Sequence, residues 1–226
     1  TCYDTGLQSA CIVRWPGKVK PGSVSDAMIE YVDILPTFID AAGGQPVRDL
    51  DGTSFVPVLT GEATKHKRYV FGEMTTRGIN NGSPYFGIRS VRSEDFKYIV
   101  NFTPEVPFRN ACTKSAVFRS WRTKAATGDI DAAEKVRRYQ HRPAEELYAL
   151  TDDPLEWINL ADDPMYADTK ATLKAKLDAW MERCGDKGQQ TELEAHEHQG
   201  RARNSKAAKP NRNRKNQENM GRKKRQ

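Results

Sequence analysis

The sequence predicts an α/β fold, in which an α/β layer is followed by a small antiparallel sheet packed on a C-terminal helix. Three observations predict it. Residues 6–43 carry strand, turn and helix patterns in succession. Residues 88–102 predict two strands joined by a short turn. Apolar residues between positions 173 and 184 recur at the helical period.

Length and composition limit the class of protein. The chain has 226 residues, of which 37% are hydrophobic, and this length suits one large domain or two small ones. No stretch approaches the roughly 20 apolar residues that a membrane span needs. The chain opens at Thr1 without a start methionine or a signal peptide, and we interpret it as a processed product or a C-terminal fragment.

The positive charge is concentrated at the C-terminus. Residues 200–226 hold 11 of the 36 basic residues and one acidic residue, so the rest of the chain carries 25 basic against 29 acidic residues. A basic nucleic-acid-binding protein is therefore excluded for the chain as a whole. The segment has no aromatic residue for stacking on bases. It is a candidate for nonspecific polyanion contact, and the alternative is a solvated tail.

The N-terminal third predicts two strands and a helix. Residues 6–15 predict a strand that ends at the turn Pro16-Gly17, and residues 27–32 alternate in the manner of a second strand. Residues 34–42 place apolar side chains at the helical period, with Asp33 as N-cap and Gly43 as the end. A loop with one apolar turn follows at residues 50–62.

The middle of the chain predicts a sheet. A short strand at 69–71 leads into residues 72–87, which are rich in Gly, Asn and Thr and show no periodicity. Such a long aperiodic segment inside a domain is usually functional or disordered. Residues 88–92 and 96–102 predict an antiparallel hairpin. Helices are expected near 115–125 and 129–140, and a further strand at 145–150.

The last predicted element is a helix that covers one face of the sheet. Asp163 and Pro164 suit its start, and Gly185 suits its end. Its apolar stripe consists of Leu173, Leu177, Trp180, Met181 and Cys184. The four cysteines form no CxxC pair, so we expect no structural zinc site and interpret them as buried or idle thiols. Beyond about residue 188 we expect disorder.

Two segments resemble type I sulfatases. In residues 2–54 the matching positions are Tyr3, Asp4, Gly6, Ile12, Trp15-Pro16-Gly17, Asp33, Pro36-Thr37, Ala42-Gly43 and Asp51-Gly52-x-Ser54. Ala10 stands at the usual proline position. The second segment comprises IRSVRSEDFKYIVNFTPE and EELYALTDDPLEWINLADDP. It is similar to the C-terminal subdomain of this family, in particular to the bacterial branch that resembles heparan N-sulfatases (sulfamidases).

The resemblance implies a fold and its boundaries. Residues 1–62 are expected to be the C-terminal end of an alkaline-phosphatase-like sulfatase core with α/β layers. Residues 63–187 are expected to form the antiparallel sheet and helix subdomain, and residues 188–226 a basic disordered tail.

The resemblance also implies chemistry. Such enzymes use a formylglycine made within a C/S-x-P-x-R motif, a calcium ion held by Asp and Asn oxygens, and Lys and His side chains. No Cys or Ser of this chain begins that motif. The family's calcium ligands and a catalytic Lys would lie before Thr1. We therefore expect a C-terminal part that needs a missing N-terminal catalytic portion, with no catalytic or metal-ligating residue of its own.

Substrate-binding residues are expected in the aperiodic segment. The candidates are Glu73, Thr76 and Arg77. The planar fork of Arg77 suits a sulfate or carboxylate group, and Glu73 suits sugar hydroxyls or an amine. The alternative is a solvated loop with a surface arginine.

Further candidates lie on the predicted strands. Arg89 and Arg92 lie on opposite faces of one strand, so at most one faces the substrate. We favour Arg89 because it is nearer the loop, and the alternative is a surface ion pair. His141, beside Arg142, is another candidate substrate contact. Tyr3 and Asp4 we interpret as residues that orient the strand end.

The sequence thus predicts the C-terminal part of an enzyme that hydrolyses sulfate esters or N-sulfate groups on a sulfated glycan. Such an enzyme is expected to be periplasmic or secreted. The alternative is a non-catalytic polyanion-binding module whose basic tail supplies the affinity.

Overall fold

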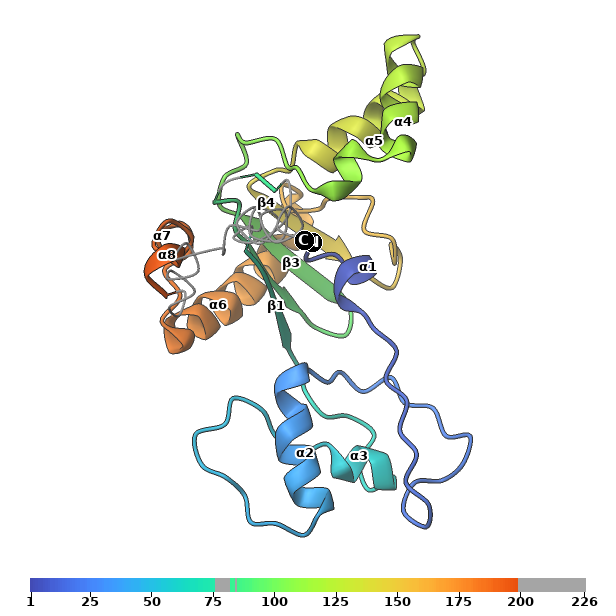
Figure 1. Ribbon diagram of the computed structural model, residues 1–226, viewed down its shortest axis with the longest axis vertical. Coiled ribbons are helices and arrows are strands. Elements are labelled where there is room, and N and C mark those ends of the chain that lie inside the picture. The colour runs from blue at the N-terminus through green and yellow to red at the C-terminus, as the bar shows by residue number, and fades with distance from the viewer. Residues whose placement is uncertain (76–81, 84, 199–226) are drawn as a thin grey trace, which may run out of the picture. The chain divides into compact units, whose positions relative to one another are not determined.

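The structure is a computed structural model that describes residues 1–75, 82–83 and 85–198. The chain divides into two compact units, Thr1–Glu192 and Leu193–Gln226. The first unit holds the sheet and nearly all of the helices (Figure 1). Of the second unit, the structure describes only residues 193–198.

Four antiparallel strands form one sheet in the order β1-β2-β3-β4 (Figure 1). The strands are β1 (Val70–Met74), β2 (Ile88–Arg92), β3 (Phe96–Asn101) and β4 (Glu145–Ala149). The strands predicted at 88–92, 96–102 and 145–150 are confirmed. The strand predicted at 69–71 also forms but extends to Met74, so Glu73 lies in β1 and not in the predicted loop. In the hairpin, Ser93 closes the turn by donating its backbone N–H to the Phe96 carbonyl at 2.8 Å.

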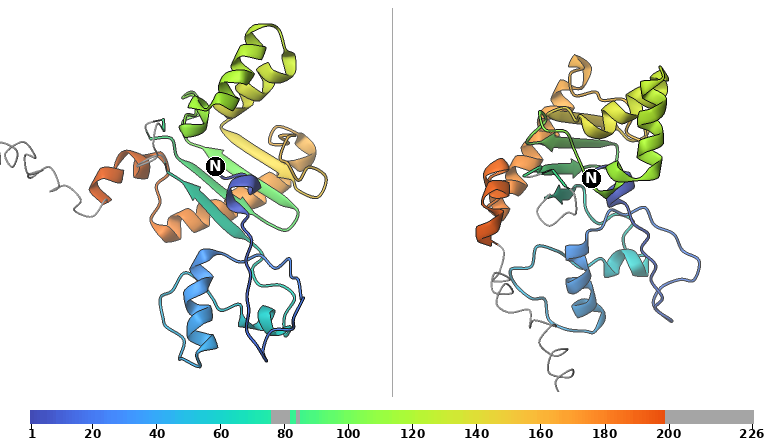
Figure 2. Two further views of the ribbon diagram at one scale, coloured as in Figure 1. Left: turned by 45° about the vertical axis from the view of Figure 1, so that its right-hand side comes forward. Right: turned by 45° about the horizontal axis from the view of Figure 1, so that its top comes forward.

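Helix α6 (Ala167–Cys184) covers one face of the sheet (Figures 1 and 2). Every second side chain of the strands packs against the predicted apolar stripe of the helix, and together they form one hydrophobic core. Its buried residues are Val91, Tyr98, Leu147, Ala161, Leu173 and Leu177. Trp180 stacks on Phe71, with ring centroids 5.1 Å apart. The helix ends at Gly185, which has φ 69°. Cys184 is exposed, so its inclusion in the stripe was wrong.

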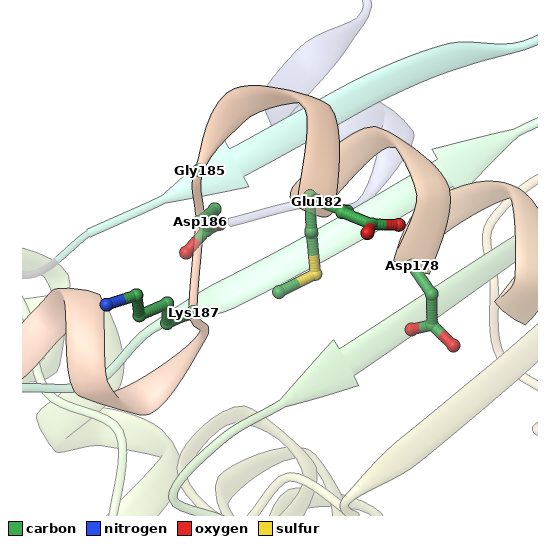
Figure 3. A pocket seen from close by; sticks show the side chains of 6 residues that line it. Asp178, Glu182, Gly185, Asp186 and Lys187 are labelled. Atoms are coloured by element: carbon green, nitrogen blue, oxygen red, sulfur yellow. The ribbon is translucent and has the colours of Figure 1, made fainter.

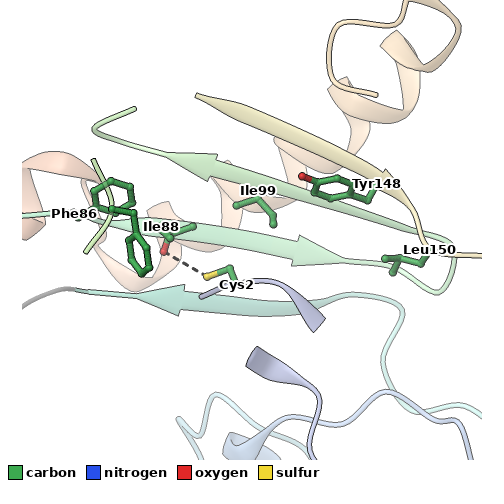
Figure 4. Packing of buried hydrophobic residues seen from close by; sticks show 7 residues of the cluster. Cys2, Phe86, Ile88, Ile99, Tyr148 and Leu150 are labelled. Atoms are coloured by element: carbon green, nitrogen blue, oxygen red, sulfur yellow. Dashed lines mark hydrogen bonds between the residues drawn. The ribbon is translucent and has the colours of Figure 1, made fainter. Parts of the chain in front are cut away.

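The opposite face of the sheet holds a second core (Figure 4). Its buried members are Cys2, Phe86, Ile88, Ile99, Phe108, Tyr148 and Leu150. The two-residue period of a strand puts Lys97 and Asn101 on the same face as Ile99. Glu146 likewise shares the face of Tyr148. This face therefore combines an apolar core with buried polar groups.

Helices α4 (Ala116–Ala126) and α5 (Ile130–Gln140) confirm the helices predicted near 115–125 and 129–140. They pack against each other as a hairpin (Figures 1 and 2). Ser115 accepts a hydrogen bond from the Phe118 N–H at 3.1 Å, and Asp129 accepts one from Ala132 at 2.9 Å. Both helices therefore begin at side-chain N-caps. A short 3₁₀ helix, η2 (Ala111–Lys114), precedes α4.

The strands predicted at 6–15 and 27–32 are wrong. The structure has instead a single helical turn, α1 (Asp4–Leu7), then non-regular backbone up to the 3₁₀ helix η1 (Tyr31–Asp33). Ile12 and Val24 are 93% and 92% exposed. A strand needs a hydrogen-bonding partner, and within the described residues this segment has none in the sheet.

Helix α2 (Ile34–Ala41) forms as the pattern predicts, with Gly43 at φ 72° after it, but the side chain of Asp33 makes no capping hydrogen bond to this helix. In the predicted loop at 50–62, the apolar turn forms the short helix α3 (Val56–Thr60). Buried Asp33 accepts the Thr53 N–H at 2.9 Å, and the Thr37 hydroxyl accepts the Phe55 N–H at 3.0 Å. A Cβ on Gly52 would lie 2.0 Å from the Val32 carbonyl oxygen. These contacts explain physically why the motifs around Asp33 and Gly52 occur together.

The 3₁₀ helix η3 (Pro164–Tyr166) precedes α6, and Asp163 accepts the Met165 N–H at 2.9 Å. Two short helices, α7 (Gln189–Leu193) and α8 (Ala195–His198), follow α6. The expectation of disorder beyond residue 188 is therefore wrong for residues 189–198. Buried Glu192 accounts for the order of α7, because its carboxylate accepts a hydrogen bond from Thr75 at 2.6 Å and pairs with Arg89. The remainder of the predicted tail lies outside the described residues.

Candidate functional site

The N-terminal segment lies against the sheet face opposite α6 (Figure 4). Cys2 is 1% exposed, and its Sγ lies 3.9 Å from the Ile88 carbonyl oxygen. Burial raises the pKa of the Cys2 thiol, which disfavours the nucleophilic thiolate. All four cysteines are unpaired. Cys2 is therefore a packing residue, as the interpretation of buried or idle thiols expects.

A buried carboxylate joins Tyr3 to strands β3 and β4. Glu146 is 1% exposed. It accepts hydrogen bonds from the hydroxyls of Tyr3 at 2.6 Å and Tyr148 at 2.5 Å. It also accepts one from Asn101 Nδ2 at 2.7 Å. Burial, followed by the neighbouring Glu146 charge, raises the pKa of Tyr3, so its hydroxyl stays protonated and donates.

Asp4 belongs to a second polar cluster on this face. Lys97 is fully buried and bonds to the Asp4 carboxylate, and its Nζ lies 2.9 Å from Glu156 Oε1. Arg92 Nε lies 3.2 Å from Asp4 Oδ2. The cluster therefore holds two cations and two carboxylates, which balances the buried charge. These contacts fasten the Tyr3-Asp4 segment to the sheet, so both residues have a structural role, although the strand end that they were expected to orient does not form.

The two carboxylates of this cluster differ in their pKa. Burial alone would raise the pKa of Asp4, but hydrogen bonds and charge from Lys97 and Arg92 outweigh it and lower the pKa. Burial raises the pKa of Glu156. Glu156 also has φ 56°, in a region that costs a non-glycine residue about 1–3 kcal/mol. Its backbone N–H and side-chain contacts hold it there, since Glu156 Oε2 accepts the Asp4 N–H at 2.7 Å.

Two predicted substrate-binding residues, Glu73 and Arg89, lie opposite each other on β1 and β2. Arg89 is 3% exposed. Its Nε lies 2.5 Å from Asp186 and its Nη2 lies 2.9 Å from Glu192. The Glu73 carboxylate is 4.0 Å away, with 65% of its side chain exposed. The structure therefore pairs Arg89 with internal carboxylates, as the ion-pair alternative expects, except that the pair is buried.

Of the other predicted substrate contacts, the structure describes His141 and places it away from this pair. Thr76 and Arg77 lie outside the described residues. His141 caps the C-terminus of α5 and is exposed. It precedes β4, at the sheet edge opposite β1. Its neighbour Arg142 is 4% exposed and lies over the ring of Tyr3.

A shallow hollow of about 420 Å³ lies at the C-terminal end of α6 (Figure 3). Its lining residues are Asp178, Met181, Glu182, Gly185, Asp186 and Lys187. Three carboxylates against one ammonium group disfavour a sulfated ligand. Asp186 is also occupied by Arg89. This hollow is therefore a poor candidate for a sulfate site.

The described part of the chain offers no group of three or more His, Cys, Asp or Glu side chains arranged to hold a metal ion. Calcium prefers six to eight oxygen ligands. The described residues therefore do not fit the calcium ion that the sequence resemblance implies for the family. None of the helices in this part of the chain is both long and apolar enough to cross a membrane.

Sequence reasoning missed the buried polar residues of the sheet. The sequence pattern places Lys97, Asn101 and Glu146 in strands and predicts no partner for them. The sequence of β3 contained an indication of this role, because Lys97 and Asn101 lie on the same face of the strand as Ile99 and on the opposite face from Tyr98. A polar residue on a strand face that is otherwise apolar indicates a buried partner.

The sheet, its covering helix and the motif series agree with the comparisons to known proteins, by which the chain belongs to the sulfatases and corresponds to their C-terminal portion. Residues 1–107 match the model of a family described as N-sulphoglucosamine sulphohydrolase, C-terminal. A solved structure of a protein in complex with its substrate D-glucosamine-2-N,6-O-disulfate has the same fold, with a TM-score of 0.55 and 22% identity. That likeness covers 79% of this chain and 29% of that one.

Curated relatives give the same result. An ulvan-active sulfatase of Formosa agariphila is 37% identical over 187 residues, which cover 82% of this chain and 35% of the relative. The human N-sulphoglucosamine sulphohydrolase is 28% identical over 191 residues, which cover 74% of this chain and 37% of the relative. The chain therefore spans little more than a third of the length of these relatives.

Proposed function

We propose that the chain is the C-terminal part of a sulfatase that hydrolyses sulfate esters or N-sulfate groups on a glycan. The relationship to the ulvan-active sulfatase is the main support, because it extends over 187 residues at 37% identity. In this proposal the chain contributes fold and substrate recognition. A formylglycine and a calcium site would belong to a portion outside residues 1–226, and no step of the reaction is assigned to a residue of this chain.

The choice between the two kinds of sulfate group rests on the relatives. The matching family is described as N-sulphoglucosamine sulphohydrolase, which favours an N-sulfate substrate. An N-acetylglucosamine-6-O-sulfatase of Bacteroides thetaiotaomicron, 33% identical over 101 residues, favours an ester. We propose N-sulfoglucosamine as the first substrate to assay and 6-O-sulfated glucosamine as the second.

Substrate contacts are proposed at Glu73, Thr76, Arg77 and His141, whereas Arg89, which is buried and paired with Asp186 and Glu192, is proposed to position this region and not to touch the substrate. Glu73 is supported by its exposed carboxylate beside the buried Arg89. Arg89 in turn holds the segment after α6 through Asp186 and holds α7 through Glu192. A protein that acts on extracellular sulfated glycans is proposed to be periplasmic or secreted.

The experiment is a comparison of two proteins. Purified residues 1–226 and the longer protein encoded by the same reading frame are incubated with N-sulfoglucosamine and with glucosamine-6-sulfate, and free sulfate is measured by ion chromatography. We expect release only by the longer protein. Turnover by residues 1–226, with contaminating enzyme excluded, would contradict the proposal.

Contact residues are then tested in the longer protein. Glu73→Gln is expected to raise KM with little change in kcat, because a contact of this kind stabilises the bound substrate and the transition state equally. Glu62→Gln is the matched control, since Glu62 is exposed in the loop after α3. Equal kinetics in both variants would remove Glu73 from the proposed contacts.

A second candidate function is a polyanion-binding module. The observation that favours it is the charge of residues 200–226, with 11 basic residues and one acidic residue. Binding through such a segment weakens steeply as salt increases. If residues 1–226 bind a sulfated polysaccharide with this salt dependence and no longer sulfatase exists in the reading frame, this function replaces the first.

A further inference from the structure

Arg142 is a buried cation outside both polar clusters. It lies between the end of α5 and the start of β4, and it is 4% exposed. Its guanidinium carbon lies 4.7 Å from the ring centroid of Tyr3 and 4.6 Å from that of Phe108. These contacts with two aromatic rings orient the group and leave its N–H edge as the direction for hydrogen bonding.

This N–H edge lacks an anionic partner. Nε of Arg142 is buried without a hydrogen-bond partner, and no ion pair joins Arg142 to a carboxylate of the described residues. Glu146, which bonds to Tyr3, is already engaged by three donors. By contrast, Arg89 and Lys97, which are equally buried, each contact two carboxylates. A buried charge without a partner lowers the stability of the fold by several kcal/mol. An anion bound at Arg142 would compensate this cost.

We infer that Arg142 is the receptor for one oxyanion group, a sulfate or a carboxylate, carried by the sulfated glycan. This inference rests on the proposed function and deepens it. The guanidinium presents N–H donors in a planar fork, which matches the oxygens of either group. The aromatic contacts hold the fork in place before the ligand arrives, which reduces the entropy lost on binding.

A neighbouring acceptor extends the site to a sugar. Asn101 Oδ1 is also buried without a hydrogen-bond partner. The Nδ2 of the same side chain donates to the carbonyl of Pro143, the residue after Arg142, at 2.7 Å. A sulfated sugar carries both an oxyanion and hydroxyl donors, which are the kinds of partner that Arg142 Nε and Asn101 Oδ1 lack.

The direct test observes the guanidinium itself. The Nε–H resonance of Arg142 is recorded by NMR on residues 1–226, during titration with sodium sulfate, sodium glucuronate or sodium chloride at matched ionic strength. We expect sulfate or glucuronate to shift this resonance in a saturable manner and chloride not to do so. A response to sulfate alone assigns a sulfate group, and a response to glucuronate alone assigns a carboxylate. No saturable shift with either anion would overturn the inference.

A set of variants provides an independent measurement. Arg142→Gln is expected to weaken the affinity measured by calorimetry for the responding anion about tenfold or more, because a charge-assisted pair is lost. Arg142→Lys retains the charge without the fork and is expected to fall between Arg142→Gln and the unaltered chain. Arg122→Gln is the matched control, since Arg122 is exposed on α4, and it is expected to bind as the unaltered chain does.

The outcomes separate this inference from the proposed function. Unchanged affinity in Arg142→Gln would overturn the anion site and leave the assay of sulfate release by the longer protein unaffected. If Arg142→Gln does not fold, the titration of the unaltered chain still decides the matter. Sulfatase activity by residues 1–226 alone would contradict the proposed function without altering the titration result.

Discussion

At the scale of single residues, the sheet holds its buried charges by pairing them on both faces. Lys97 contacts Asp4 and Glu156 on the face opposite α6, and Arg89 contacts Asp186 and Glu192 at the other. Removing one member of such a group leaves the others as unpaired buried charges.

Lys97→Met is expected to destabilise the chain by about 3–5 kcal/mol at neutral pH, because Asp4 and Glu156 are left without their buried cation. Urea unfolding followed by circular dichroism measures the change. Lys65→Met is the control, since Lys65 pairs with Glu94 at the exposed surface, and its unfolding curve is expected to be nearly that of the unaltered chain. Similar curves for both variants would contradict the assignment of a buried charge group.

The Arg89–Asp186 pair predicts a dependence on pH. Although burial alone would raise the pKa of Asp186, Arg89 outweighs it and lowers this pKa below its ordinary value of 3.8. The stabilisation is therefore complete above about pH 4 and is lost as the pH falls through the pKa of the folded state. Asp186→Asn is expected to be less stable at pH 7 and to lose less free energy of unfolding between pH 4 and pH 2. Asp152→Asn, an exposed control, should reproduce the acid limb of the unaltered chain.

At the scale of elements, the sequence correctly predicted the strands and helices whose apolar face packs against another part of this chain. The hairpin of β2 and β3 and the stripe of α6 each meet a partner within the chain, so their periodicity corresponds to burial. Residues 6–15 and 27–32 also have a strand-like pattern, yet Ile12 is 93% exposed and no strand forms. Periodicity predicts a face to be buried but does not identify what pairs with it.

The same limit applies to the candidate site. The opposite faces of Arg89 and Arg92 were predicted correctly from the strand period, and the structure pairs them with Asp186 and Asp4 respectively. The partners themselves are 97 and 88 residues away along the chain. No local pattern in the sequence indicates contacts over such separations. The buried role of Glu192 was missed for this reason.

Helix α6 offers a direct test of its role in the core. Leu177 is 1% exposed in the cluster beneath the sheet. Leu177→Ala is expected to cost about 2–5 kcal/mol, because it removes buried methyl groups and leaves a cavity. Leu155→Ala is the control, since Leu155 is 63% exposed, and a change within about 0.5 kcal/mol is expected. A small effect of Leu177→Ala in thermal or urea unfolding would show that α6 contributes little to the core.

At the scale of the whole molecule, the net charge of +6 conceals two parts of opposite sign. Residues 200–226 carry 11 basic residues and one acidic residue, whereas residues 1–199 carry 25 and 29. The compact unit Thr1–Glu192 contains both clusters of buried charge and both apolar cores. Its stability should therefore be independent of the basic segment.

Deletion of residues 200–226 is expected to leave the free energy of unfolding within about 0.5 kcal/mol of that of the full chain. It is expected to lower the salt concentration at which the chain elutes from a sulfated resin, because the net charge changes sign. The pair of measurements is calorimetric unfolding and elution in a salt gradient. A large loss of stability would show that the segment belongs to the fold.

The hydrogen bonds at the two margins of the sheet have a consequence for solubility. An edge strand with free N–H and C=O groups can pair with a strand of another molecule and start aggregation. On β1, Glu30 Oε1 accepts the Phe71 N–H at 2.7 Å. On β4, Asn159 Oδ1 accepts the Leu147 N–H at 2.9 Å, and the Leu147 carbonyl accepts the Leu160 N–H at 2.8 Å. Segments of the chain itself thus occupy positions on both edges and protect the sheet from edge-to-edge association.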